Sequence, residues 1–430
     1  MTFQASMTFF LYAYVMSFFI SMAGMEVASW MAVAIALGGM FATRFHERQG
    51  FASLGWRPFR VGADLGFLAL VAVVVVGWAL NRADGADLWQ ILGGIRWIAT
   101  FYALTWILRW RGVDPRILAP YGLSLFVSGL YGFVTFFTAW EFFRHRALEP
   151  IAASGVARAV SFLGFPMTWG HTMAMATCFG VGVLALRPFD WTSKRSRWLG
   201  IGFGLATAFA ALNVGMSFTR GAWIGAAAGL VVSAIALGRR SLTGFVVALS
   251  LAVGAVCVVS PNVRERAASI FSAEPSSNQQ RIQLWQANWL MFEEHPLFGV
   301  GLNENERLAP EYHAKLGHAG AFAGHAHNNF LQFLSSTGAL GFLAFTGLFV
   351  YFFVWSWRLL RRIPEANRWH RGLVLGSLGA QVALHVGGLT ECNFKAMTVN
   401  HHFVFQLALI AALREIYAPV SAAEKPGETP

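Results

Sequence analysis

The sequence predicts an all-α integral membrane protein with about twelve transmembrane helices and one large loop outside the membrane. First, only 12% of the 430 residues are charged and 56% are hydrophobic, whereas a soluble domain carries roughly 25% charged residues. Second, apolar segments recur with the length of about 20 residues that crosses a hydrocarbon core of roughly 30 Å. Third, the polar residues concentrate in one long stretch, residues 261–327. This composition excludes a soluble enzyme, a coiled coil and a disordered chain.

Twelve segments have the length and apolar composition of a membrane-spanning helix. The first two are separated only by the short run Met22–Glu26, and the fourth contains Arg96. The predicted spans are residues 5–22, 25–43, 64–81, 88–108, 117–138, 165–186, 198–217, 221–238, 242–260, 328–355, 372–390 and 400–417.

These spans divide the chain into four parts. Nine helices lie within residues 1–260, the large loop follows at 261–327, three helices lie within 328–417, and a tail occupies 418–430. A shorter outside loop is expected at about 139–163.

The distribution of basic residues predicts the orientation of these helices. With the N-terminus inside, 20 Lys and Arg residues fall in inside segments and 11 in outside ones. Five of those 11 belong to the large loop, and loops of that length cross the membrane largely regardless of charge. Because basic residues collect in cytoplasmic loops, both termini and the tail are predicted to be cytoplasmic. The same preference accounts for the formal net charge of +11 without any binding of nucleic acid.

The large loop is predicted to contain helices. Its opening, residues 262–269, is polar and helical in character. In residues 279–292 the apolar side chains recur three or four positions apart, which is typical of an amphipathic helix lying on the membrane or on the helix bundle. The apolar positions of this predicted helix are Ile282, Trp285, Leu290 and Phe292.

Two arginines are candidate anion ligands. Arg220 follows a very short outside turn and begins a predicted helix, where unpaired backbone N–H groups already favour anions. Arg281 lies in the amphipathic segment of the large loop. A guanidinium with its fixed fork of donors suits a phosphate. The alternatives are a lone arginine reaching the interface for Arg220, and a solvated arginine on a polar helix face for Arg281.

Two histidines and a carboxylate lie where outside segments meet the membrane. His325 and His327 form an H-x-H pair that resembles a pair of metal ligands, but the loop contains no Asp or Cys to complete a metal site. A histidine here is also a candidate general base, since it accepts a proton near neutral pH. Glu391, at the outer end of the eleventh span, is expected to orient a histidine or to pair with an arginine. Ordinary interfacial histidines and a helix-end charge are the alternatives.

Several motifs together resemble the O-antigen ligase/polymerase superfamily. The resemblance covers about residues 150–395, and the order of the motifs makes it specific. The motifs are Ser217-Phe-Thr-Arg-Gly-Ala-Trp223, His295-Pro-Leu-Phe-Gly-Val-Gly301, His325-Ala-His-Asn-Asn-Phe-Leu-Gln332, Thr337-Gly-Ala-Leu-Gly341 and Gly388-Leu-Thr-Glu-Cys-Asn-Phe394. Within the superfamily the chain is most similar to the lipopolysaccharide O-antigen ligases, which have twelve spans and one large periplasmic loop.

This resemblance implies a glycosyltransferase type C-like fold in the bacterial inner membrane, with the active site on the periplasmic face. It implies metal-independent, inverting transfer of O-antigen polysaccharide from undecaprenyl diphosphate to the lipid A–core oligosaccharide. No cofactor is expected, and the expected partners are these two lipid-linked saccharides and the membrane lipids.

The resemblance also implies roles for individual residues. His327 is the base, and Arg220 and Arg281 bind the diphosphate. The supporting residues are Glu391, His325, Asn328 and Arg158, with His171 as a weaker candidate. Two alternatives stay open: an O-antigen polymerase with the same donor chemistry, and, in a different class, a transporter or flippase that uses the same basic cavity.

Overall fold

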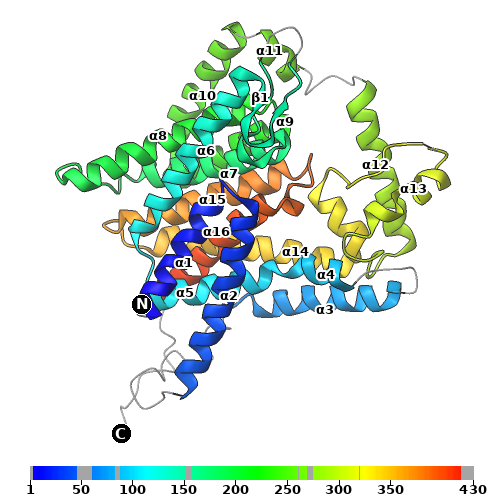
Figure 1. Cartoon of the computed structure of the whole chain (residues 1–430), viewed down its shortest axis with the longest axis horizontal. Coiled ribbons are helices and arrows are strands. Elements are labelled where there is room, and N and C mark those ends of the chain that lie inside the picture. Colours follow the sequence, from blue (N-terminus) through cyan, green and yellow to red (C-terminus); the bar gives the residue numbers. More distant parts are fainter. Residues whose placement is uncertain are drawn as a thin grey trace.

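The computed structural model describes residues 3–45, 61–82, 88–151, 156–259, 261–268, 275–318 and 320–417. The predicted all-α class is confirmed, because the described regular elements are helical apart from a short antiparallel hairpin (Figure 1). That hairpin pairs β1 (Trp140–Glu141) with β2 (Arg146–Ala147) in the predicted smaller loop. The predicted cytoplasmic tail, residues 418–430, lies outside the described residues.

The N-terminal part of the chain forms six helices. They are α1 (Phe3–Ser17), α2 (Met22–Phe45), α3 (Asp64–Asn81), α4 (Leu88–Ile95), α5 (Trp97–Arg111) and α6 (Leu118–Thr138). The first two helices separate at residues 18–21, just before the predicted boundary at Met22–Glu26.

The predicted fourth span is not one continuous helix. It breaks at Arg96 into α4 and α5, and the Arg96 guanidinium forms an ion pair with Glu26 of α2. A charged side chain within a membrane segment requires a partner, and the break places Arg96 against its partner.

Helices α7 to α10 follow. They are α7 (Pro166–Ala185), α8 (Lys194–Met216), α9 (Arg220–Leu237) and α10 (Arg239–Val259). Helices α7 and α9 both pack closely on α15 (Arg368–Gly387), because glycines leave no side chain between the backbones: Gly182 faces Gly376, and Gly229 faces Gly379. Small residues at such contacts allow membrane helices to approach closely. The packing brings the start of α9 beside the segment that follows α15.

The large loop contains the two helices that its pattern predicted, α11 (Pro261–Ala268) and α12 (Pro275–Glu294), and a third that was not predicted, α13 (Asn305–Lys315). In Figure 1, α12 and α13 lie together at the right-hand side. The buried face of α12 differs from the predicted one. It consists of Leu284, Ala287, Asn288 and Met291, whereas Ile282 is exposed. These positions keep the i, i+3, i+4, i+7 spacing of a helix face, but alanine and asparagine replace large apolar residues because α13 and α14 approach closely there.

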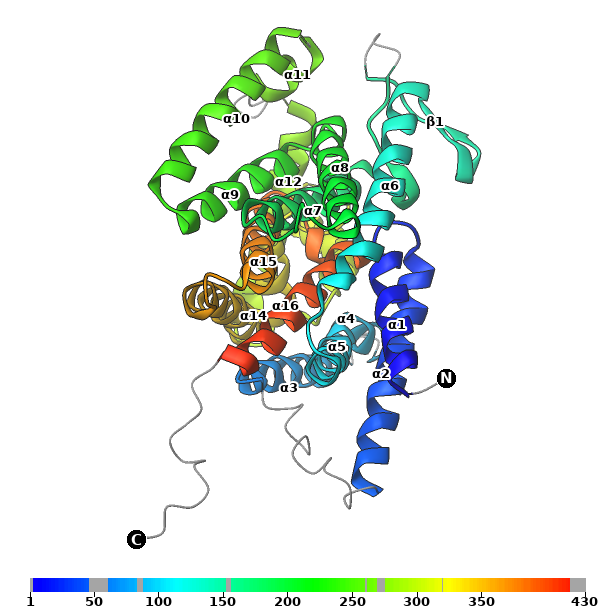
Figure 2. The same ribbon diagram turned by 90° about the vertical axis from the view of Figure 1, so that its left-hand side faces the viewer.

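The C-terminal part contains α14 (Asn329–Arg362), α15 and α16 (Met397–Tyr417). Helix α16 lies near the centre of the bundle in Figure 2, and residues 398–413 are all buried. Its buried residues include Asn400, His401, His402 and Gln406. A helix surrounded by other helices can carry such polar side chains, since they contact protein rather than lipid.

Among the described residues, seven helical segments are long and apolar enough to cross a membrane, against the twelve spans predicted. The other five predicted segments also contain helices, namely α1, α7, α10, α15 and α16. The chain is therefore a helical membrane protein, and the number twelve stays a prediction.

Candidate active site

The loop that leads into α14 is held from two sides through the backbone of Ala326. The Ala326 N–H donates to Oε1 of Gln332 on α14 at 2.9 Å, and the Ala326 carbonyl accepts from Nε1 of Trp285 on α12 at 2.8 Å. His325 and His327 flank this fixed residue. His327 has a φ of 45°, a left-handed conformation that non-glycine residues seldom adopt and that clusters at functional sites.

Buried amides anchor this arrangement. Nε2 of Gln332 donates to Oδ1 of Asn305 at 2.8 Å, and Nδ2 of Asn305 donates to Oδ1 of Asn288 at 2.7 Å. The Ser335 hydroxyl also donates to Oδ1 of Asn288, at 2.7 Å. All four side chains are buried, and buried polar groups are stable only when they are hydrogen-bonded. The network joins α12, α13 and α14 into one support for the histidine loop.

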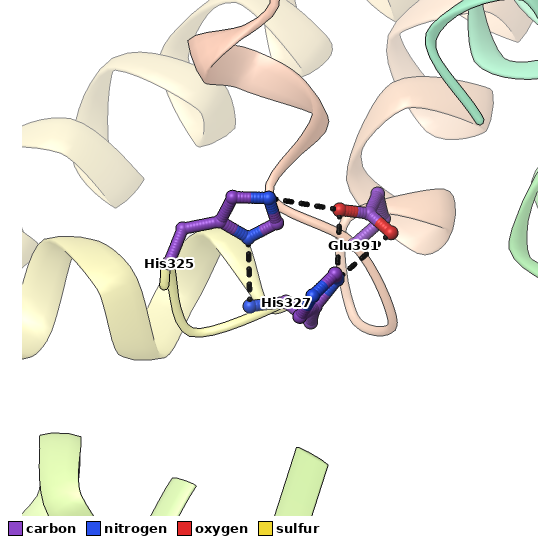
Figure 3. A group of neighbouring side chains, drawn as sticks. All are labelled: His325, His327 and Glu391. Carbon is purple, nitrogen blue, oxygen red and sulfur yellow. Dashed lines mark hydrogen bonds and ion pairs between the residues drawn. The ribbon is translucent and has the colours of Figure 1, made fainter. Parts of the chain in front are cut away.

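Glu391, in the segment after α15, contacts both histidines (Figure 3). Nδ1 of His327 lies 3.0 Å from each carboxylate oxygen, and Nε2 of His325 lies 3.6 Å from Oε1. Nδ1 of His325 accepts the backbone N–H of His327 at 3.2 Å. The structure thus brings together three of the residues singled out in the sequence.

The contacts determine how the protons are arranged. An ionised carboxylate can only accept hydrogen bonds, so Nδ1 of His327 carries the proton and Nε2 is left as the basic nitrogen. Burial raises the pKa of the Glu391 carboxyl, but the hydrogen bond from His327 and the charges that the two imidazoles carry when protonated outweigh burial and hold this pKa below its usual value. Burial lowers the pKa of the His325 imidazole.

Arg281 and Arg220 converge on the same place from α12 and α9. Nη2 of Arg281 lies 3.9 Å from Oε2 of Glu391, and the Arg281 side chain is 26% exposed. Arg220, the first residue of α9, lies close enough to Arg281 for their positive charges to repel. His171, buried in α7, interacts electrostatically with both Glu391 and Arg281. Two guanidiniums brought together near the histidine pair create a local positive field that suits an anionic ligand.

Arg158 and Asn328 occupy supporting positions. Arg158 donates to the carbonyl of Ser217 at 2.8 Å and to Oγ1 of Thr219 at 3.0 Å, and so holds the turn before Arg220. Asn328 caps α14, since its Oδ1 accepts from the N–H of Phe330 and of Leu331, and its amide donates to the carbonyl of Leu389 at 3.1 Å. Both residues position elements that carry the site.

Sequence reasoning missed two asparagines that join the motifs. Nδ2 of Asn329 donates to Oδ1 of Asn393 at 2.6 Å, and the Asn329 backbone N–H donates to the carbonyl of Gly388 at 2.7 Å. The amide of Asn393 also lies 3.2 Å from Nδ1 of His171. Both asparagines belong to the motifs quoted in the sequence analysis. An asparagine in each of two such motifs was the signal that could have identified them. With Gln332 and Trp285, they fix the relative position of the histidine loop and Glu391.

The same three side chains could hold a metal ion. His325, His327 and Glu391 each offer one ligand atom, and these atoms lie within 4.8 Å of one another. The large loop itself contains no Asp or Cys, and the fold supplies the third possible ligand from residue 391. The guanidinium of Arg281 beside Glu391 opposes a cation there, because like charges repel at short range.

Comparison with known families gives one match. Residues 205–346 match the family model described as O-antigen ligase. The matched segment covers about a third of the chain. The match confirms the superfamily that the motifs resembled, whose members are glycosyltransferase-like enzymes acting on lipid-linked sugars. No curated protein matches the chain.

The O-antigen ligase match contains five of the predicted site residues: Arg220, Arg281, His325, His327 and Asn328. Glu391 lies beyond it, and the fold returns that carboxylate to the histidines through α15. The segment after α15 therefore completes the cluster from outside the matched residues.

Proposed function

We propose that this protein is an O-antigen ligase that transfers O-antigen polysaccharide from undecaprenyl diphosphate to the lipid A–core oligosaccharide on the periplasmic face of the inner membrane. The observation that carries the proposal is the hydrogen bond between His327 and Glu391 beside the two arginines. A base oriented by a carboxylate, next to a site for an anion, is the arrangement that attack on a sugar diphosphate requires.

The reaction follows from these groups. Nε2 of His327 takes the proton of an acceptor hydroxyl, and the hydroxyl oxygen forms a bond to the anomeric carbon of the donor sugar. The bond between that carbon and the diphosphate oxygen breaks, and the diphosphate leaves with the bonding electrons. Attack from the face opposite to the leaving group inverts the anomeric centre. Glu391 holds the ring and stabilises the imidazolium that forms.

Arg220 and Arg281 have the complementary task. The departing diphosphate gains negative charge, and two guanidiniums can stabilise that charge through short charge-assisted hydrogen bonds. Their mutual repulsion is relieved when an anion binds between them, so donor binding and site organisation favour each other. Nδ1 of His325 accepts the backbone N–H of His327, which suits a residue that shapes the loop.

The test is transfer by the purified protein in lipid nanodiscs without ATP. The substrates are undecaprenyl-diphosphate-linked O-antigen and lipid A–core, and the expected product is lipid A–core carrying the polysaccharide. Longer lipid-linked chains formed without lipid A–core would identify a polymerase instead. Movement of donor across the bilayer with no new glycosidic bond would identify a transporter. Either result would overturn the ligase proposal.

A further inference from the structure

A cavity lies beside the histidine–glutamate cluster. It has a volume of about 250 Å³ and lies between α4, α14, α16 and the segment 392–395. We call it the α4–α16 cavity. Glu391 contacts the histidines and Arg281, whereas its neighbour Cys392 lines the cavity. The same short segment therefore touches both the cavity and the cluster beside Arg281.

The α4–α16 cavity is also connected to the base through one side chain. Gln332 lines the cavity and, through Oε1, holds the Ala326 N–H between His325 and His327. A ligand in this cavity would therefore lie next to the support of the histidine loop. That is the position an acceptor needs if the donor diphosphate occupies the arginines.

The walls of the cavity combine apolar side chains with polar ones, and the charges among them are compensated. Arg96 lines the cavity and is paired with Glu26, and Lys395 lines it and lies 2.5 Å from Glu306. Because each cation already has a carboxylate, the cavity is not arranged to bind an anion. It favours a neutral ligand with many hydroxyl groups.

Asn400 is the clearest sign that a ligand belongs there. Its side chain lines the cavity and is only 8% exposed. Within the part of the chain that the structure describes, its side-chain amide makes no hydrogen bond to another residue, and its polar atoms are accessible from the cavity. A sugar hydroxyl can serve this amide as both donor and acceptor. Gly93, at the cavity wall, leaves open space where a side chain would stand.

We propose that the α4–α16 cavity binds a terminal, uncharged sugar unit of the acceptor oligosaccharide. The volume lies below the roughly 300–1,000 Å³ of pockets for drug-sized ligands, which fits a single sugar rather than a polysaccharide chain. Asn400 hydrogen-bonds the sugar, and the sugar's position aims the acceptor hydroxyl of the same oligosaccharide at His327. This inference rests on the proposed ligase function.

The experiment measures acceptor and donor binding separately. Deacylated lipopolysaccharide core oligosaccharide is titrated into wild type, Asn400→Ala and Gly93→Leu by isothermal calorimetry, and undecaprenyl diphosphate is titrated in parallel. Transfer kinetics follow with each substrate varied. The control is Gly347→Leu, which makes the same change at a glycine of α14 that also faces open space but lies away from the cavity.

We expect Asn400→Ala and Gly93→Leu to weaken core oligosaccharide binding about tenfold and to raise the acceptor KM equally, which is the effect of losing about 1.4 kcal/mol. Binding of undecaprenyl diphosphate and kcat at saturating acceptor should stay near wild type, and Gly347→Leu should resemble wild type throughout. Because Gly93→Leu fills open space without removing a hydrogen bond, it tests the cavity even if Asn400→Ala folds poorly.

The two proposals fail in different ways. If wild type transfers O-antigen but both variants bind core oligosaccharide normally, the cavity assignment is wrong and the ligase function stands. If the variants lose undecaprenyl diphosphate binding instead, the cavity belongs to the donor and the inference is overturned. If wild type binds core oligosaccharide at this cavity but never transfers, the ligase function fails while the binding site stands.

Discussion

His327 and Glu391 are 64 residues apart in the sequence and meet through Nδ1 of the imidazole, 3.0 Å from each oxygen of the carboxylate. One partner comes from the loop before α14 and the other from the segment after α15. The contact leaves Nε2 of His327 as the basic nitrogen, and it places the pair beside Arg281. The predictions below follow from this relationship.

Replacing His327 should remove the general base of the reaction. General-base assistance contributes roughly 10²–10⁴-fold, so His327→Ala should lower transfer by about that factor while donor binding persists through the arginines. Glu391→Gln should also lower kcat, because a neutral amide no longer stabilises the imidazolium. His325→Ala should lose less. Rates and donor affinity of the three folded variants provide the check, and near-normal transfer by His327→Ala would refute the base assignment.

Arg220 and Arg281 should act through charge and through the shape of the guanidinium. We expect Arg→Ala at either position to lower transfer about 10²-fold or more, since a diphosphate loses a charge-assisted contact. Lysine should restore activity only in part, because it lacks the bidentate fork. Arg264→Ala, on exposed α11, is a matched control that should keep wild-type transfer. Full activity of both Arg220→Ala and Arg281→Ala would leave the two as interfacial arginines.

Excess EDTA should not reduce transfer. His325, His327 and Glu391 have the spacing of metal ligands, but the hydrogen bond from Nδ1 of His327 to Glu391 and the nearby Arg281 favour the metal-free state. The measurement is the transfer rate before and after dialysis against EDTA, with metal content determined in both samples. Activity lost with EDTA and restored by one divalent ion would make the three residues metal ligands.

Gln332 is predicted to be a positioning residue. Gln332→Leu removes the acceptor for the Ala326 N–H and the donor to Asn305, so the histidine loop should lose its fixed position. We expect kcat to fall about tenfold or more, with the KM for donor little changed. The control is Gln381→Leu, a buried glutamine of α15 bonded to Ser356. Both variants should lose thermal stability by leaving buried polar groups unpaired, but only Gln332→Leu should lower kcat. Equal effects on kcat would indicate a purely structural role.

The orientation can be tested by labelling single cysteines with a membrane-impermeant thiol reagent in a background without Cys178, Cys257 and Cys392. Ala323→Cys, beside the histidine loop, should react from the periplasm. Glu365→Cys, between α14 and α15, should react only after the membrane is opened, because five basic residues in this connection predict a cytoplasmic position. Reaction of Ala323→Cys from the cytoplasm alone would reverse the orientation and contradict the periplasmic site.

The sequence by itself determined the class of the protein and the residues worth examining. Low charge and repeated apolar segments of spanning length require helices in a membrane, since backbone groups in lipid must be hydrogen-bonded internally. The exposed polar clusters around Arg220, Arg281, His327 and Glu391 stood out because ionisable groups at membrane boundaries are costly without a partner. The motifs then indicated the superfamily that the match at residues 205–346 supports.

Only the tertiary structure decided which of these groups touch and what supports them. Hydropathy is a local property, so it could not show that α4 and α5 break at Arg96 to meet Glu26, or that α16 is enclosed by other helices. Spacing along the large loop could not supply the carboxylate for His327, because Glu391 arrives through α15 from outside the loop. The amides of Gln332 and Asn305 look like ordinary polar residues in sequence. Packing excludes water from both amides, so that each must form its hydrogen bonds with a residue of another helix.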